Sequence, residues 1–130
     1  MSTFRRIIVK EKEYLWKYSY DDNDYQNVSS LIVKSIDKKG KLIIYFKTKT
    51  WDQGYCPFNQ GIPAKLKNKQ VVINLNQPHY VEELIVVVLD KSQINDLIGT
   101  VVIDDGIQLF HDLGYDFEYQ KTWDNSTVKF

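Results

Sequence analysis

Apolar and polar residues alternate along the first half of the chain, and this alternation is typical of half-buried β-strands. Residues 4–10 and 14–20 form two such segments, and the short polar stretch 11–13 between them suits a hairpin turn. The stretch lacks the Asn-Gly or Asp-Gly pair of the commonest tight turns, so its sequence leaves the register of the hairpin open. The second segment places four rings on one strand face: Tyr14, Trp16, Tyr18 and Tyr20.

The aromatic face of residues 14–20 either packs in the core or forms a contact surface. The opposite face carries Leu15, Lys17 and Ser19, which would make a poor core face. We therefore expect the rings to pack in the core. If the helices left them uncovered, they would form an exposed apolar patch that needs a partner.

The clearest hairpin joins residues 28–36 to residues 41–48 through the polar stretch 37–40. Asp37 can open the turn, and Gly40 can adopt the positive φ that a tight loop often requires. The second strand is expected to point three side chains at the core: Leu42, Ile44 and Phe46.

Residues 49–70 show no periodicity and contain glycines and prolines, which predicts a long irregular connector. A short apolar strand is expected at 71–75. Residues 76–91 then predict a helix, with Asn76 as its cap and Pro78 in its first turn. Its apolar positions follow i, i+3, i+4 spacing and predict a buried stripe: Tyr80 or Val81, then Leu84, Ile85, Val88 and Leu89.

The last third of the chain mixes both kinds of element. We expect a short helix at 92–98, a strand at 99–105, a helix at 106–114 that ends at Gly114, and a half-exposed strand at 115–123. The prediction is therefore one α+β domain over residues 1–130. Its antiparallel or mixed sheet comes from the N-terminal strands, and two or three helices from the C-terminal half pack on one face.

Charge is distributed unevenly along the chain although the formal net charge is zero. Residues 1–69 hold 14 basic and 7 acidic side chains, whereas residues 70–130 hold 3 basic and 10 acidic ones. Such asymmetry can indicate an electrostatic partner for one half. The simpler interpretation is that the two halves pack together and offset each other's charge.

A cytoplasmic location is expected from the cysteine content and the apolar runs. The single cysteine excludes an intrachain disulfide. The apolar run at 7–9 is too short for a signal peptide, and the run at 84–89 is too short to span a membrane. The pattern of residues in the stretches "YLWKYSYDD" and "CPFNQG" resembles that of small bacterial proteins. This resemblance implies no fold or activity.

Residues 51–61 ("WDQGYCPFNQG") are the most unusual segment of the chain. Large rings sit on a loop stiffened by glycine and proline, and packing of these rings can offset the entropy lost by ordering it. We interpret the segment as a stiff aromatic lip that buries its rings or presents them to a protein or small-molecule ligand. The residues predicted to bind are Lys49, Trp51, Tyr55, Phe58 and Asn59. A non-catalytic binding or protein-interaction module is thus the leading functional hypothesis.

A cysteine-dependent enzyme is the second hypothesis, with Cys56 as nucleophile and His79 as base. Cys56 is not predicted at a helix N-terminus, where a lowered pKa would be easiest to explain. No pair among Cys56, His79 and His111 shows the short spacing typical of zinc ligands, and no glycine-rich phosphate loop is present. We therefore expect neither a metal nor a cofactor.

A single-stranded nucleic-acid binder is the third hypothesis. Basic clusters at 38–41, 47–49 and 65–69 flank an aromatic-rich segment, and cations beside exposed rings suit phosphate contacts and base stacking. Against it, the calculated pI of about 6.7 is far below that of a typical nucleic-acid-binding domain. The oligomeric state is left open, and no membrane partner is expected.

Overall fold

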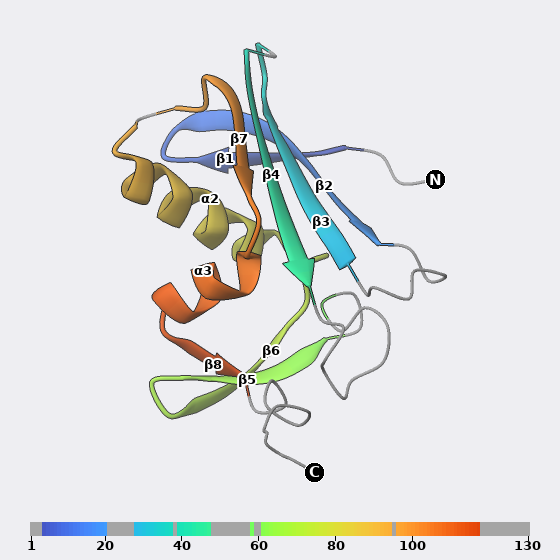
Figure 1. The fold of residues 1–130 in the computed structure, drawn as a ribbon, viewed down its shortest axis with the longest axis vertical. Helices are drawn as coiled ribbons and strands as arrows, with labels where there is room; N and C mark the ends of the chain where they lie inside the picture. The colour runs from blue at the N-terminus through green and yellow to red at the C-terminus, as the bar shows by residue number, and fades with distance from the viewer. Residues whose placement is uncertain are drawn as a thin grey trace.

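The computed structural model describes residues 4–20, 28–37, 39–47, 58, 61–94 and 96–117. These residues form two β-sheets and, in the C-terminal half, two helices (Figure 1). The predicted α+β class is confirmed, as is the origin of the main sheet in the N-terminal strands. Both helices lie on the same side of the larger sheet (Figure 1).

The larger sheet has five strands in the order β1-β2-β3-β4-β7. Their bounds are Arg5–Val9, Lys12–Tyr20, Val28–Ser35, Gly40–Lys47 and Gly99–Ile103. The first four are antiparallel neighbours, as expected for consecutive hairpins, whereas β7 pairs parallel to β4. The parallel pairing requires a long crossover, and the chain makes it through the second sheet and the first of the two helices.

The β1–β2 hairpin turns through Lys10 and Glu11, which have φ values of 50° and 68°. Two consecutive positive φ angles are the geometry of the mirror-image turn that normally carries Asn-Gly. Neither residue is suited to this conformation, which is why the sequence gives no turn signal there.

Changing this turn to Lys10→Asn with Glu11→Gly is expected to raise the free energy of unfolding by about 1 kcal/mol, because the strained φ angles become easy to adopt. The lost ion pair between Lys10 and Asp90 is exposed at both ends and offsets little of this gain. Urea denaturation measures the change. Glu13→Gly, at an extended strand position, is the control and is expected to lower stability. A double variant no more stable than wild type would contradict the turn geometry.

The smaller sheet corrects the sequence prediction for residues 49–70. It has the order β6-β5-β8, with β5 at Ile62–Leu66, β6 at Lys69–Ile73 and β8 at Tyr115–Phe117. Part of the expected irregular connector is therefore a hairpin, turned at Lys67 and Asn68 with φ values of 53° and 67°. The expected strand at 71–75 begins two residues earlier, and residues 118–123 lie outside the described residues.

The predicted long helix is confirmed as α2, Pro78–Ser92. Its expected stripe is buried, and both of the alternatives at its start, Tyr80 and Val81, are buried as well. Its cap is a correction. Gln77 occupies the N-cap position without a side-chain hydrogen bond, while the Asn76 backbone N–H donates to Asn74 Oδ1 at 2.8 Å. Asn76 is thus part of the turn before the helix, one residue too early to cap it.

The short helix expected at 92–98 does not form. Gln93 is left-handed with a φ of 56° and ends α2, and the described residues that follow are irregular up to β7. The next helix, α3, spans Gly106–Asp112, where the Asp105 side chain accepts a hydrogen bond from the Gln108 backbone N–H. Gly114 has a φ of 102° just after α3, as predicted for a residue that ends a helix.

The core lies between the larger sheet and the two helices, with α2 against β1 and α3 against β4. The core face predicted for β4 is confirmed, because Leu42, Ile44 and Phe46 are fully buried. The aromatic ladder of β2 also packs inward. Tyr14, Trp16 and Tyr18 are buried and only Tyr20, at the strand end, is exposed.

Gly40 has a role other than the one predicted. It is the first residue of β4 and has no positive φ, and a Cβ atom there would collide with the backbone of Leu97. The turn itself depends on Asp37, as predicted. Its carboxylate accepts hydrogen bonds from Ser35 Oγ at 2.7 Å and from the Lys39 N–H at 3.1 Å.

Candidate functional site

The predicted aromatic lip is described only at Phe58. This ring has no exposed surface and packs against Phe46, Phe110 and Phe117 at centroid distances of 5.0, 5.6 and 5.7 Å. Its carbonyl oxygen accepts a hydrogen bond of 2.8 Å from the Leu75 N–H. Phe58 therefore has the packing role, one of the two roles expected for the rings of this segment.

The other residues predicted to bind lie outside the described residues: Lys49, Trp51, Tyr55 and Asn59. Cys56 does too, so its proposed pairing with His79 stays a prediction. His79 is exposed in the first turn of α2, with its ring 3.8 Å from that of Tyr80. Within the described ranges, no group of three or more His, Cys, Asp or Glu residues could hold a metal ion.

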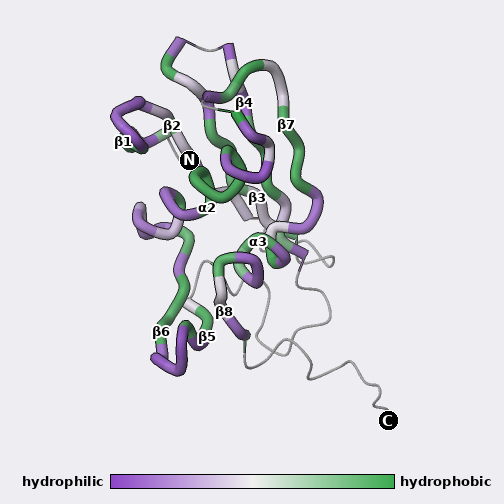
Figure 2. Tube along the Cα trace, turned by 90° about the vertical axis from the view of Figure 1, so that its left-hand side faces the viewer, coloured by the Kyte–Doolittle hydropathy of each residue, from purple (hydrophilic) through white to green (hydrophobic). Residues whose placement is uncertain are grey.

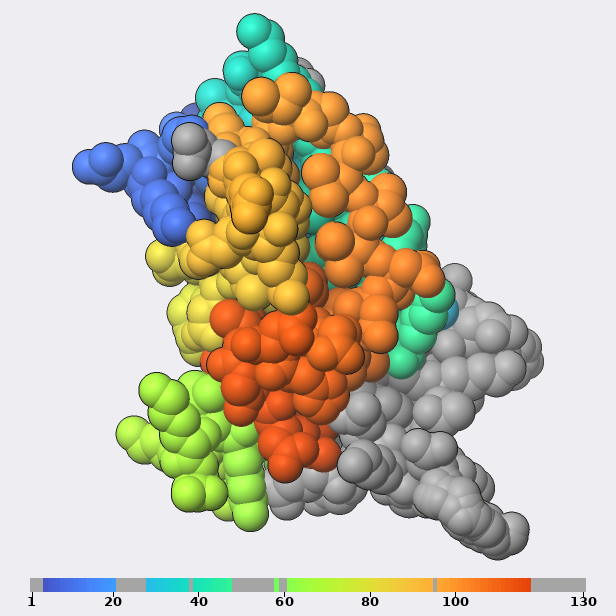
Figure 3. Space-filling model, turned by 60° about the vertical axis from the view of Figure 1, so that its left-hand side comes forward, coloured from blue at the N-terminus to red at the C-terminus, as the bar shows by residue number. Residues whose placement is uncertain are grey.

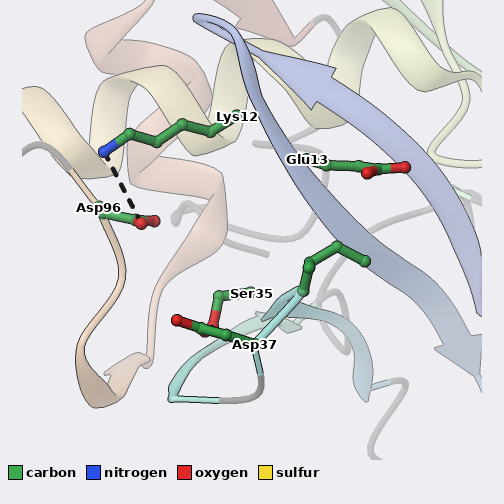
Figure 4. Close-up of a pocket in the computed structure, with 6 residues that line it drawn as sticks. Lys12, Glu13, Ser35, Asp37 and Asp96 are labelled. Carbon is green, nitrogen blue, oxygen red and sulfur yellow. Dashed lines mark hydrogen bonds and ion pairs between the residues drawn. The ribbon is translucent and has the colours of Figure 1, made fainter.

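A hollow of about 240 Å³ opens where the start of β2 meets the end of β3 and the segment before β7. Figure 4 shows its polar side chains: Lys12, Glu13, Ser35, Asp37 and Asp96. The Lys12 ammonium points at Asp96, and the distance between their charged atoms is 3.7 Å (Figure 4).

The polar groups of this hollow are largely engaged in holding the fold together. Asp96 accepts hydrogen bonds from the Tyr14 hydroxyl at 2.9 Å and from the Leu97 N–H at 2.8 Å. Burial, and then the bond to Asp96, raise the pKa of the Tyr14 hydroxyl. The hydrogen bond from Ser35, followed by that from Lys39, lowers the pKa of Asp37. We interpret the hollow as the structural junction that anchors the segment before β7 to the sheet.

The side of the five-stranded sheet away from the helices has a different composition. We call it the outer face and define it by the strand positions that alternate with the buried ones, together with Phe4. Its cations are Arg6, Lys17, Lys34, Lys41 and Lys47. Its main apolar side chains are Phe4, Leu15, Ile32, Ile43, Tyr45 and Val102. No described helix or strand packs over this face.

Strand register places three of these cations close together on the central strands. Lys34 lies directly opposite Lys41 across the β3–β4 pair, and Lys17 lies opposite Ile32 on the neighbouring β2–β3 pair. Like charges directly opposite each other destabilise a sheet. The stability of the fold therefore does not explain why Lys34 and Lys41 face each other.

Ion pairs neutralise only the margins of the outer face. Arg6 binds Glu13 at 3.2 Å and Lys47 binds Asp104 at 2.9 Å. Among the described residues, no carboxylate lies within ion-pair distance of Lys17, Lys34 or Lys41. We call these three side chains the lysine cluster.

The lysine cluster borders the ring of Phe4. The Lys34 ammonium lies 4.4 Å from the ring centroid and that of Lys17 lies 5.7 Å from it. These cation–π contacts hold two ammonium groups against the outer face rather than letting them extend freely into solvent. The cluster is thus a positioned set of cations beside aromatic surface.

Opposite charge gathers on the helix side of the molecule. The helices α2 and α3 lie next to each other on the face shown in Figure 3. Most of the exposed charged residues of these two helices and their flanking segments are acidic: Glu82, Asp90, Asp105, Asp112 and Asp116. The asymmetry along the sequence is therefore also an asymmetry in space. A neutral molecule presents a basic sheet face and an acidic helix side.

The two halves of the chain also pack together, as the simpler interpretation of their charges predicted. Lys10 binds Asp90 at 3.5 Å, Lys12 binds Asp96 at 3.7 Å and Lys47 binds Asp104 at 2.9 Å. Each pair joins a cation of the basic half to a carboxylate of the acidic half. These exposed pairs contribute little to stability, and they lie at the rim of the sheet rather than in the lysine cluster.

The outer face is not evident as a site from the sequence alone. In the sequence, Lys17 marks only the face of its strand that lies opposite the predicted core, and Phe4 is not among the predicted site residues. The sequence pattern could nevertheless have indicated this site. Lys17, Lys34 and Lys41 all occupy strand positions that alternate with the buried ones, so their side chains point away from the core.

In the described part of the chain, α2 and α3 are both too short to cross a membrane. Comparisons of the chain with protein-family models, with curated proteins and with solved structures found no match.

Proposed function

We propose that this protein is a non-catalytic binding module that holds single-stranded nucleic acid on the outer face of its five-stranded sheet. The observation that carries the proposal is the lysine cluster. Its three ammonium groups have no carboxylate partner among the described residues, and two of them face each other at the register where like charges repel. A phosphate backbone crossing the strands would supply the missing counter-charge.

The apolar side chains of the outer face favour a nucleic acid over a simple anion. Phe4 lies beside the lysine cluster, and Tyr45 is half-buried opposite the small side chain of Ser30. Aromatic rings on an open sheet are platforms on which unpaired bases stack, while cations between them contact phosphates. The calculated pI argued against this class, but the charge is segregated in space and the binding face itself is basic.

The aromatic lip stays part of the proposal as a second contact region. Trp51, Tyr55 and Asn59, with Lys49, remain predicted to bind a protein or small-molecule ligand. A cytoplasmic location also remains proposed, and it rests on the single cysteine, which excludes an intrachain disulfide. The resemblance to bacterial proteins stays a prediction.

Fluorescence anisotropy with a labelled single-stranded oligonucleotide, at low and at moderate salt, tests the proposal. The triple variant Lys17→Gln, Lys34→Gln, Lys41→Gln is expected to bind at least about tenfold more weakly than wild type. The slope of log affinity against log salt should fall by about 2, because three phosphate contacts are lost. The matched control is Lys65→Gln, Lys67→Gln, Lys69→Gln, which removes the same charge from the exposed β5–β6 hairpin.

Three outcomes of this experiment would contradict the proposal. Wild type could fail to bind at low salt, or the control variant could lose as much affinity as the triple variant. Alternatively, poly-glutamate could bind as tightly as the oligonucleotide, which would reassign the face to an acidic protein partner. A duplex of the same length is expected to bind more weakly, since its bases cannot stack on the rings.

A further inference from the structure

The β7 strand is one edge of the five-stranded sheet, and no described strand pairs with its free side. Residues 97–103 (LIGTVVI) carry no charge and no proline. Figure 2 shows β7 as a mainly hydrophobic stretch at the margin of the molecule, followed by hydrophilic residues. Ile98 is 80% exposed and Val102 is 55% exposed.

The opposite edge of the same sheet is protected in the usual way. Two cationic residues, Arg5 and Arg6, lie in β1, and a third, Lys10, directly follows it. Charged side chains on an edge strand oppose pairing with another chain, whereas an uncharged edge with free backbone N–H and C=O groups is a template for it. Among the described strands, the contrast identifies β7 as the edge that can accept a further strand.

We propose that β7 pairs antiparallel with β7 of a second copy of this chain, which joins the two larger sheets into one continuous sheet. With the two-fold axis at Val101, Thr100 of each copy lies opposite Val102 of the other. Every directly opposed pair within the strands is then uncharged. This proposal rests on the edge alone and does not depend on the proposed function.

Charge complementarity favours a second copy over an unrelated peptide. One end of β7 lies beside the basic Lys39 and Lys41, and the Lys39 carbonyl accepts a hydrogen bond of 2.9 Å from the Gly99 N–H. The other end continues into two carboxylates and one cation, because Asp104 binds Lys47 at 2.9 Å and Asp105 accepts a hydrogen bond from the Gln108 N–H, so it carries a net negative charge. An antiparallel two-fold pairing brings the acidic end of each β7 to the basic end of the other, so the dimer has two such favourable charge contacts.

The dimer would also extend the outer face. The two-fold axis runs perpendicular to the joined sheet, so both outer faces point to the same side. The lysine clusters of the two copies would then lie on one continuous surface.

Sedimentation velocity from micromolar to near-millimolar protein concentration tests the pairing. Wild type is expected to dimerise, and Val102→Lys to weaken the association by about tenfold or more, because two new ammonium groups meet diagonally across the interface. The matched control is Ile8→Lys, which adds a lysine to the same sheet face on the other edge strand. Ile8 is 67% exposed, and this variant is expected to dimerise as wild type does.

Amide hydrogen exchange provides a second measurement that needs no variant. Protection of the β7 amides is expected to increase with protein concentration, while protection of the β1 amides should not change. A wild-type chain that stays monomeric over the whole range would overturn the proposal. So would equal weakening by Val102→Lys and Ile8→Lys, or a monomer whose β7 instead binds an unrelated strand-forming peptide.

Discussion

Replacing Phe58 with alanine is expected to lower the free energy of unfolding by about 3–5 kcal/mol, the usual loss for a fully buried phenylalanine. The ring contacts Phe46 from the larger sheet, Phe110 from α3 and Phe117 from the smaller sheet. It therefore lies where three parts of the fold meet, and its removal leaves a cavity that none of them can fill without moving. Urea denaturation followed by tryptophan fluorescence measures the change.

Tyr20→Ala is the control for this experiment. Tyr20 is also an aromatic residue, but it lies exposed at the end of β2. Its removal is expected to cost less than about 1 kcal/mol. Equal losses of unfolding free energy for the two variants would mean that the Phe58 ring does not pack in the core. Residues 51–61 would then be interpreted as a contact surface.

Gly40→Ala is expected to destabilise the protein by about 3 kcal/mol, because the new methyl group would collide with the backbone of Leu97. Backbone atoms cannot move aside as the end of a flexible side chain can. The collision should also loosen the segment before β7, since Gly99 bonds to the Lys39 carbonyl next to this point. Thermal and urea denaturation measure the loss.

Gly99→Ala separates this steric effect from backbone strain. A Cβ atom at Gly99 meets nothing within 4 Å, although the φ of +72° is unfavourable for alanine. The expected cost is about 1 kcal/mol, from the left-handed conformation alone. If Gly99→Ala proved as damaging as Gly40→Ala, close packing of Gly40 against Leu97 would not be the dominant effect.

Strands β1 to β4 and the long helix could be predicted because each buries one face only. In β4, the outward Lys41, Ile43 and Tyr45 alternate with fully buried residues, and the helical spacing in α2 is equally regular. Elements whose local pattern conflicts with their structure were missed. Residues 92–98 place Ile94, Leu97 and Ile98 at helical spacing, yet Gln93 is left-handed and the chain turns away.

The β5 strand illustrates a second reason for failure. Pro63 lies in the central strand of the smaller sheet, where proline is rarely found because it cannot donate to the ladder. β8, however, pairs only with Ala64, Lys65 and Leu66, so β5 has a single neighbour at Pro63. The turn at Lys67 and Asn68 also lacks glycine. Only the tertiary pairing shows that this segment is a strand.

The candidate site could be predicted in its composition but not in its arrangement. The sequence shows the basic half and its aromatic residues, and it also shows the neutral overall charge. It does not show that Lys34 and Lys41 are directly opposite, because that depends on the register of two strands. Nor does it show that the acidic half folds onto the other side of the sheet.

Binding of single-stranded nucleic acid to the outer face is tested most directly by titrating the ¹⁵N-labelled protein with a short single-stranded oligonucleotide and following the titration by NMR. Amide shifts are expected to concentrate in the strands that carry Lys17, Lys34 and Lys41, with little change in α2 and α3. Shifts confined to the helices, or no shifts at low salt, would contradict binding to the outer face.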